Sequence, residues 1–270
     1  MRIKHWGFRK MTEYTDTGLE SLGSIPSHWE KCSIRAITRL RNERGRPELP
    51  LLSVYRDYGV ILKSSRDDNR NPEGQDLSTY KVVHIGDLVL NKMKTWQGSL
   101  GVSEFKGIVS PAYIVCALRE DMNPRFIHYL LRSDPYVYEY NRISYGVRVG
   151  QWDMRYDEFK RIPLYLPPTP EQEKIVAFLD ARLNELFQLI SRYRQLVGVA
   201  AKSLAEKEKS LLHVYRKSLI TEAVTGKLDV RGVELSKLDE PKLMEDREIG
   251  EEAEVDEAGD TEEVADGEEQ

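Results

Sequence analysis

Cysteine is scarce in this sequence, and so are the patterns that hold metals or nucleotides. Cys32 and Cys116 lie far apart without a CxxC pattern, and the five histidines show no metal-ligand spacing. These absences argue against a disulfide framework and a zinc site, and both thiols are expected to be buried or half-buried. Gly226-Lys227 lacks the upstream glycine and the following serine or threonine of a phosphate-binding loop. We therefore predict no metal and no cofactor in this chain.

Long hydrophobic runs are also absent. No stretch approaches the roughly 18 to 20 apolar residues of a membrane span. The first ten residues, MRIKHWGFRK, contain basic residues but no apolar core of a signal peptide. The expectation is a cytoplasmic protein without a membrane partner.

The net charge of −5 conceals an uneven distribution. Residues 232–270 contain 17 acidic and three basic residues, which leaves 37 basic and 28 acidic residues in the rest of the chain. The body is thus basic, at +9, and the tail is acidic, at −14. A basic body favours a polyanionic partner, and a tail with no aromatic residue is predicted to be disordered.

The chain divides into four segments by composition. We expect a leader at 1–30, a mixed α/β domain at 31–165, a long helix at 169–226 and the acidic tail at 232–270. Strand-like runs such as KVVHIGDLVLNKMK, GIVSPAYIVCAL and RIPLYLP are separated by glycine turns, with one helix-like stretch from Asn123 to Tyr140. The predicted fold class is α+β.

The stretch LPPTPEQEKIVAFLD predicts a sharply defined helix start. Thr169 suits the N-cap, Pro170 the first helical position, and Gln172 completes a capping box. Heptad spacing from Val176 continues through Leu211 and predicts one long coiled-coil helix that ends near Gly226. The apolar seam, which we expect to mediate dimerisation, consists of Val176, Leu179, Leu183, Leu186, Ile190, Tyr193, Val197, Ala200, Leu204 and Leu211.

Four strings carry a resemblance to a known family. They are EYTDTGLESLGSIPSHWE, GDLVLNKMKTWQGSLGVSEFKGIVSPAYIV, LPPTPEQEKIVAFLD and SLITEAVTGKLDVRG, in that order along the chain. Together they resemble the specificity subunit of type I restriction-modification systems. Family members typically have two target-recognition domains and two conserved helices, so this chain is similar to a half-length form.

The resemblance implies that DNA recognition and catalysis belong to different subunits. The recognition domain would read one half of a split site in double-stranded DNA, and paired helices would set the spacer and dock DNA methyltransferase subunits. S-adenosylmethionine, ATP and Mg²⁺ would belong to the partner subunits, among which a restriction/translocase subunit is also expected. With one domain and one helix, the chain is expected to pair with a second copy, as a homodimer.

Three stretches offer side chains suited to DNA. In LNKMKTWQGSL, an extended chain would place Lys92, Lys94 and Trp96 on one face, next to Gln97. The glycines of SYGVRVGQWDMR permit close approach of a groove, and SSRDDNRNPEG is a polar loop. The candidate residues in these last two stretches are Arg148, Gln151, Trp152 and Arg155, and Arg66 and Arg70.

Two other functions stay open at this point. A stand-alone nuclease or methyltransferase with a divergent site would cleave or methylate DNA unaided, whereas a recognition subunit would bind without chemistry. A coiled-coil assembly protein would show no salt-dependent DNA binding.

Overall fold

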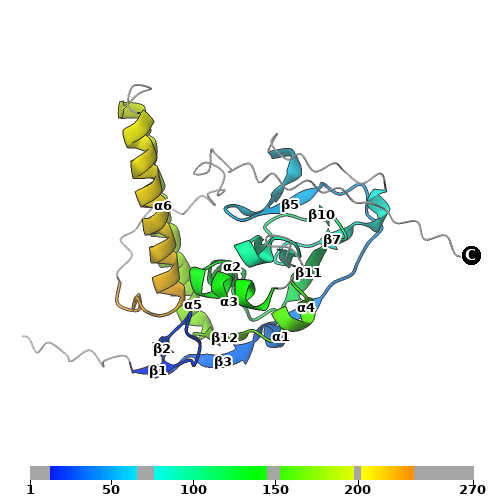
Figure 1. Cartoon of the computed structure of the whole chain (residues 1–270), viewed down its shortest axis with the longest axis horizontal. Coiled ribbons are helices and arrows are strands. Elements are labelled where there is room, and N and C mark those ends of the chain that lie inside the picture. The colour runs from blue at the N-terminus through cyan, green and yellow to red at the C-terminus, as the bar shows by residue number, and fades with distance from the viewer. Residues whose placement is uncertain (1–12, 66–75, 145–152, 198–201, 234–270) are drawn as a thin grey trace, which may run out of the picture.

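A computed structural model describes residues 13–65, 76–144, 153–197 and 202–233. Of residues 193–197 and 202–210 only the backbone is described. Figure 1 shows a mixed α/β domain with a pair of long helices standing at one side. The predicted α+β domain followed by helix is therefore present, while the acidic tail lies outside the described residues.

The strands are short and pair antiparallel. They are β1 (Tyr14–Asp16), β2 (Ser24–Pro26), β3 (Glu30–Ser33), β4 (Thr38–Leu40), β5 (Leu52–Tyr55), β6 (Gly59–Leu62), β7 (Lys81–Val83), β8 (Leu88–Asn91), β9 (Leu100–Val102), β10 (Gly107–Val109), β11 (Tyr113–Leu118) and β12 (Pro163–Leu166). The largest described sheet has the order β4-β11-β8-β9, and two-stranded sheets pair β1 with β2, β3 with β12, β5 with β6, and β7 with β10.

The helices lie mainly in the second half of the chain. They are α1 (Ile34–Ile37), α2 (Pro124–Leu131), α3 (Asp134–Ile143), α4 (Tyr156–Phe159), α5 (Thr169–Val197) and α6 (Lys202–Val224), with the 3₁₀ turns η1 (Lys63–Ser65), η2 (Leu77–Thr79) and η3 (Thr95–Gln97).

The four-stranded sheet separates two hydrophobic cores. In β8, Leu88 and Leu90 face the larger core, while Val89 between them faces the smaller one. Cys116 and Val115 divide in the same way in β11. Side chains alternate across a strand, so a sheet covered on both faces needs an unbroken apolar run. This requirement explains the strings LVL and YIVCAL, and the strand predictions for these stretches are confirmed.

The described part of the predicted leader packs into the same core as the domain. Leu22, Ile25 and Trp29 are buried, and β3 begins at Glu30 and pairs with β12. The Tyr165 hydroxyl donates to the Thr17 carbonyl oxygen at 2.8 Å. Residues 13–30 therefore close the core beside the start of α5 and the end of α6.

The helix-like stretch from Asn123 to Tyr140 is two helices, not one. Asn123 caps α2 by accepting hydrogen bonds from the N–H groups of Arg125 and Phe126. The chain then leaves the helix, and Ser133 occupies the N-cap position of α3, with Pro135 in its first turn. Proline lacks the N–H that a continuous helix would need at this position, which accounts for the break.

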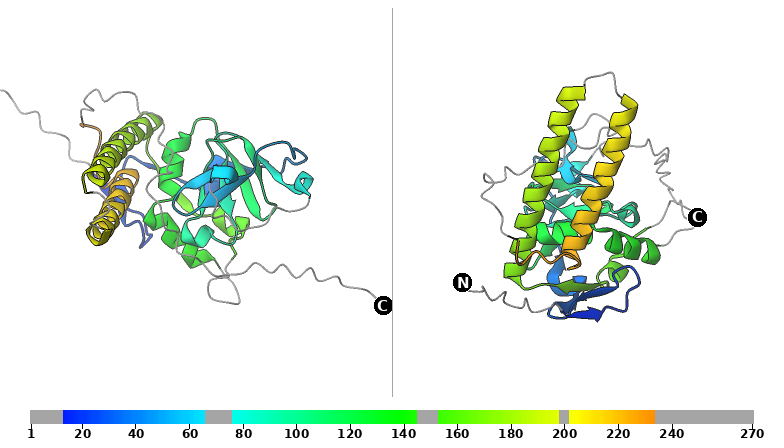
Figure 2. Two further views of the ribbon diagram at one scale, coloured as in Figure 1. Left: turned by 90° about the horizontal axis from the view of Figure 1, so that it is seen from above. Right: turned by 90° about the vertical axis from the view of Figure 1, so that its left-hand side faces the viewer.

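The long helix predicted over 169–226 is also two helices. Figure 2 shows α5 and α6 side by side and antiparallel, so the chain doubles back instead of extending about 80 Å as one helix of that length would. The residues between them include Gly198, whose helix propensity is poor. Heptad spacing identified the apolar stripe correctly as a feature of helices, but spacing alone does not show which segment covers the stripe.

The predicted capping box of Thr169 and Gln172 is wrong. The N–H groups of Glu171 and Gln172 bond to the Pro168 carbonyl oxygen, so Pro168 takes the N-cap position and Thr169 is the first helical residue. Gln172 is buried, and its side chain forms other hydrogen bonds. Its amide nitrogen donates to the Pro167 carbonyl oxygen at 2.9 Å, and its side-chain oxygen accepts from the Asn123 N–H at 3.3 Å. This glutamine ties the start of α5 to the start of α2.

Candidate nucleic-acid interface

Three cations gather where β7 begins and β8 ends. Arg44 forms an isolated bridge with Lys81, and Lys92 follows directly after β8. We call Arg44, Lys81 and Lys92 the basic cluster. Lys81 is buried, and its ammonium donates to the Tyr113 carbonyl oxygen at 2.5 Å. Burial lowers the pKa of Lys81, and the positive charges of Lys92 and Arg44 lower it further. A bound anion would oppose this lowering of the pKa, because opposite charge favours the ammonium form.

The described chain next to the other two candidate DNA-binding stretches also lies beside the basic cluster. The Met154 N–H donates to the Lys92 carbonyl oxygen at 3.0 Å, which joins the described end of SYGVRVGQWDMR to LNKMK. The Gly45 N–H donates to the Ser78 carbonyl oxygen at 3.0 Å, which places the chain just after the polar loop next to the cluster.

Most of the candidate residues in the two loops fall outside the described residues. These are Arg66, Arg70, Arg148, Gln151 and Trp152. Arg155 is described, and its side chain is exposed at the start of α4. The structure therefore shows the anchoring ends of the two loops beside the basic cluster.

The extended-strand interpretation of Lys92, Lys94 and Trp96 is wrong. The strand β8 ends at Asn91, and the residues after it turn into η3. The Trp96 indole donates to the Met93 carbonyl oxygen at 2.9 Å, and Gly98 ends the turn with a φ of 94°. The Asn91 side chain accepts from the Met93 N–H and so stabilises a local turn instead of the strand.

Because of this turn, the candidate DNA-binding residues of this stretch lie in different places. Lys92 joins the basic cluster, and Lys94 is exposed. Trp96 and Gln97 line a cleft on the side of the domain that faces α6. Arg44 and Lys81 were missed by sequence analysis, because they lie far from Lys92 in the chain and only the sheet brings the three together.

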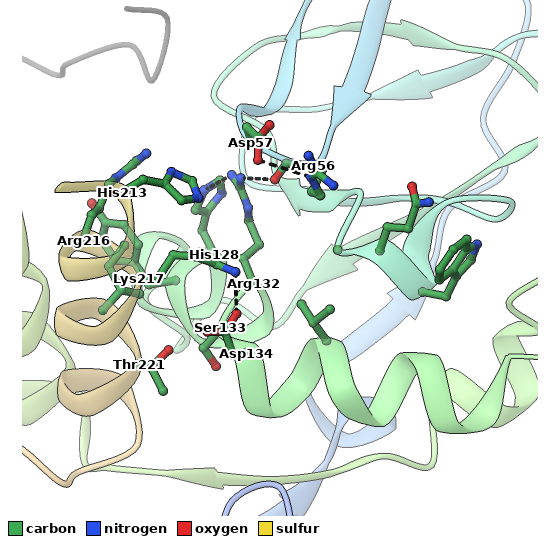
Figure 3. Close-up of a pocket in the computed structure, with 16 residues that line it drawn as sticks. Arg56, Asp57, His128, Arg132, Ser133, Asp134, His213, Arg216, Lys217 and Thr221 are labelled. Atoms are coloured by element: carbon green, nitrogen blue, oxygen red, sulfur yellow. Dashed lines mark hydrogen bonds and ion pairs between the residues drawn. The ribbon is translucent and has the colours of Figure 1, made fainter. Parts of the chain in front are cut away.

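The cleft lies between the domain and α6 and has a volume of about 580 Å³. In Figure 3, Arg56 and Asp57 lie on the domain side, and His213, Arg216 and Lys217 project from α6. His128 of α2 and Arg132, which follows α2, lie between them. We call this feature the basic cleft. It is lined by Arg56, Asp57, Trp96, Gln97, Gly98, His128, Tyr129, Arg132, Ser133, Asp134, Val137, His213, Arg216, Lys217, Ile220 and Thr221.

Interactions bridge the basic cleft at two places. Lys217 of α6 forms an ion pair with Asp134 of α3 at 2.8 Å, and the Arg132 guanidinium donates to the Arg56 carbonyl oxygen at 2.6 Å. Burial lowers the pKa of His213; Asp57 opposes this shift, and Lys217, Arg216 and Arg56 add to it. Four permanent cations thus face two carboxylates, and the cleft has a positive balance.

The residues of the predicted apolar seam differ in how deeply they are buried. Leu179 is fully buried in the core of the domain, and Val176 and Leu183 pack against that core. This finding corrects the assignment of Leu179 to a dimer surface, because the first turns of α5 anchor the helix to its own domain. Leu186 is buried and Ile190 half-buried, whereas Leu211 on α6 is 69% exposed. The side chains of Tyr193, Val197, Ala200 and Leu204 lie outside the described residues.

An exposed apolar stripe remains on α6. Leu211, Val214 and Tyr215 are all more than half exposed, at 69%, 60% and 56%. They share one helix face by their spacing of three and four residues, while Leu219, Ile220 and Ala223 pack toward the core. Such a stripe is typical of a helix that has a further partner.

Within the described residues no group of three or more histidine, cysteine or acidic side chains is placed to hold a metal ion. Among the described helices none is long and apolar enough to cross a membrane. Cys32 is half-buried and Cys116 buried, both as free thiols, as the sequence predicted.

Comparison with known proteins identifies the family. A profile of the type I restriction modification DNA specificity domain matches residues 26–196, which is well over half of the chain. The chain belongs to this family. The match includes the basic cluster, η3, α2 and α3, and most of α5. A search of curated proteins gives no match.

Solved structures of type I systems are similar only at a coarse level. One comes from a study of complex assembly and conformational transition of the type I R-M system, with 15% identity, a TM-score of 0.42, and coverage of 80% of this chain and 49% of that one. The HsdS subunit from Thermoanaerobacter tengcongensis has 15% identity, a TM-score of 0.40, and coverage of 80% and 48%. The S subunit from M. genitalium has 15% identity, a TM-score of 0.39, and coverage of 72% and 48%. This chain thus spans about half the length of each of these chains.

Proposed function

We propose that this chain is a non-catalytic, sequence-specific DNA-recognition subunit of a type I restriction-modification complex in the cytoplasm. The observation that carries the proposal is the basic cluster inside the family's specificity domain, beside the anchoring ends of two polar loops. Arg44 and Lys92 bind phosphates of double-stranded DNA, buried Lys81 adds to the positive potential, and the loops present side chains to base edges. Cleavage or methylation is the work of partner subunits, which supply S-adenosylmethionine, ATP and Mg²⁺.

The unfavourable electrostatic environment of Lys81 in the basic cluster supports this role. Buried Lys81 stands among positive neighbours, an arrangement that lowers its pKa and destabilises the free protein. Counterion release on phosphate binding offsets such repulsion. A structural role alone would be served by an uncharged side chain at the same place.

Salt dependence of DNA binding tests the proposal. The variant Arg44→Gln/Lys92→Gln removes two cluster charges, and the matched control Arg35→Gln/Arg161→Gln removes two exposed charges at α1 and after α4. We expect binding of a fluorescent 30-base-pair duplex to weaken with salt, and the slope of log K against log salt to fall by about two in the cluster variant. The control should retain the slope of the original chain. Equal salt-dependence slopes for the two variants would refute the interface. DNA cleavage by the purified chain would favour the nuclease alternative.

We further propose that the chain pairs with a second copy through the exposed stripe of α6. A homodimer brings two identical recognition domains under two-fold symmetry, so each reads one half of a palindromic split site. The paired helices set the spacer and dock the methyltransferase subunits. The stripe supports this arrangement because three large apolar side chains in water cost about 1 kcal/mol or more each relative to a covered surface.

Two measurements test the pairing. Light scattering should give twice the 31.2 kDa chain mass for the original protein and a monomer for Leu211→Asp/Val214→Asp. The control Ala177→Asp adds an aspartate at an exposed position of α5, outside the stripe, and should leave the dimer intact. Sequencing of modified bases in cells that contain the chain and its methyltransferase subunit should show a palindromic motif. An asymmetric motif would show instead that another half-length subunit is the partner.

A further inference from the structure

The basic cleft has the wrong dimensions for the duplex that the basic cluster would bind. Its volume of about 580 Å³ is that of a small-molecule pocket. The 2.8 Å ion pair between Lys217 and Asp134 also bridges it from α6 to α3. A single extended chain fits such a slot, whereas a double helix does not. A ligand that fits this cleft is therefore narrow and negatively charged.

A segment with that chemistry belongs to the chain itself. Residues 248–270 contain twelve acidic residues and no lysine or arginine. We infer that the basic cleft binds residues 248–270, so that the acidic tail crosses between α6 and the recognition domain. Arg56, Arg216 and Lys217 receive its carboxylates, and Val137 and Ile220 contact its small apolar side chains. The inference does not depend on DNA binding.

The tail can reach the cleft. The described chain ends at Val233, just after Val230, which is buried at the end of α6. The α6 residues that line the cleft run from His213 to Thr221, so they lie within about 16 Å of the end of α6 at 1.5 Å per residue. The fourteen residues 234–247 form the connecting segment, and a flexible segment of that length spans about 20 Å on average. Tethering at this distance gives an effective concentration of about a millimolar, so even weak pairing suffices.

Zero-length carbodiimide cross-linking tests the inference on the full chain. The reagent joins a carboxylate to a lysine amine in direct contact, and Lys217 is the lysine that lines the cleft. At low salt we expect tail peptides from 248–270 to be linked to Lys217. Arg56→Gln/Arg216→Gln should lower the yield about fivefold or more, because the attraction of the two guanidinium groups for the tail carboxylates is lost. Arg35→Gln/Arg161→Gln removes the same charge outside the cleft and should leave the yield unchanged.

The outcomes separate the alternatives. Tail cross-links spread evenly over exposed lysines such as Lys31 and Lys174, or equal yields in both double variants, would overturn the inference. A mixture of isotope-labelled and unlabelled chains identifies links between copies, and a predominance of such links would overturn docking within one chain. Binding of a short single-stranded oligonucleotide to the cleft, with no tail cross-link at Lys217, would assign the slot to nucleic acid. Loss of duplex binding with intact tail cross-links would instead count against the proposed function.

Discussion

A substitution at Gly226, where the end of α6 contacts the leader, gives the most specific test of the fold. Gly226 follows α6 with a φ of +71°, and its carbonyl oxygen accepts from the Tyr14 hydroxyl at 3.1 Å. A Cβ placed on Gly226 would lie 2.5 Å from Pro26 Cδ and 3.0 Å from Trp29 Cζ2. Gly226→Ala therefore adds a backbone cost and a steric cost at the same position.

The two costs can be estimated and separated. An L-residue with positive φ costs about 1 kcal/mol, and overpacking against the rigid ring of a proline adds about 1 to 3 kcal/mol. The expected loss is about 2 to 4 kcal/mol, out of roughly 5 to 15 kcal/mol of total stability for a domain. Gly45 is the matched control, because its φ is +79° and a Cβ there would meet nothing within 4 Å. Gly45→Ala should lose only the backbone cost of about 1 kcal/mol.

Urea unfolding followed by tryptophan fluorescence measures both variants, because Trp29 lies in the contact. The midpoint should fall clearly further for Gly226→Ala than for Gly45→Ala. If the two variants lose the same stability, the packing of the α6 end on Pro26 and Trp29 is incorrect, and so is the inward placement of the leader.

The remaining predictions concern the anchor of α5 and the two thiols. Asp180, whose side chain is 13% exposed, accepts from Arg125 Nε at 2.8 Å and from the Tyr129 hydroxyl at 2.7 Å. Asp180→Ala leaves both donors without this partner and should cost about 2 kcal/mol in urea unfolding, whereas Tyr129→Phe should cost about 1 kcal/mol; equal, negligible losses would contradict the anchor. Burial raises the pKa of the Cys116 thiol to about 12 and also raises that of Cys32. Ellman's reagent at pH 8 should leave Cys116 unmodified in the folded chain and modify both thiols in 8 M urea, since only the thiolate reacts. Rapid modification of Cys116 in the folded chain would show that its strand is more open than described.

Sequence patterns determined the elements whose signals are local. Strand-like runs and glycine turns predicted β7, β8, β10, β11 and β12, because a strand covered on both faces requires an unbroken apolar run. The family resemblance also rested on local strings, and the specificity-domain profile confirms it. The charge separation between body and tail is fixed by composition and needs no coordinates.

The tertiary structure decided everything that depends on which segments meet. Heptad spacing predicted an apolar stripe, yet only the packing shows that Leu179 is core, that α6 turns back beside α5, and that Leu211 faces solvent. Lys81 and Arg44 join Lys92 through strand pairing, and Trp96 turns toward the cleft because η3 interrupts the expected strand. A periodic pattern fixes the direction of a side chain relative to its own helix or strand, whereas its partners come from contacts between distant segments, which local propensity does not encode.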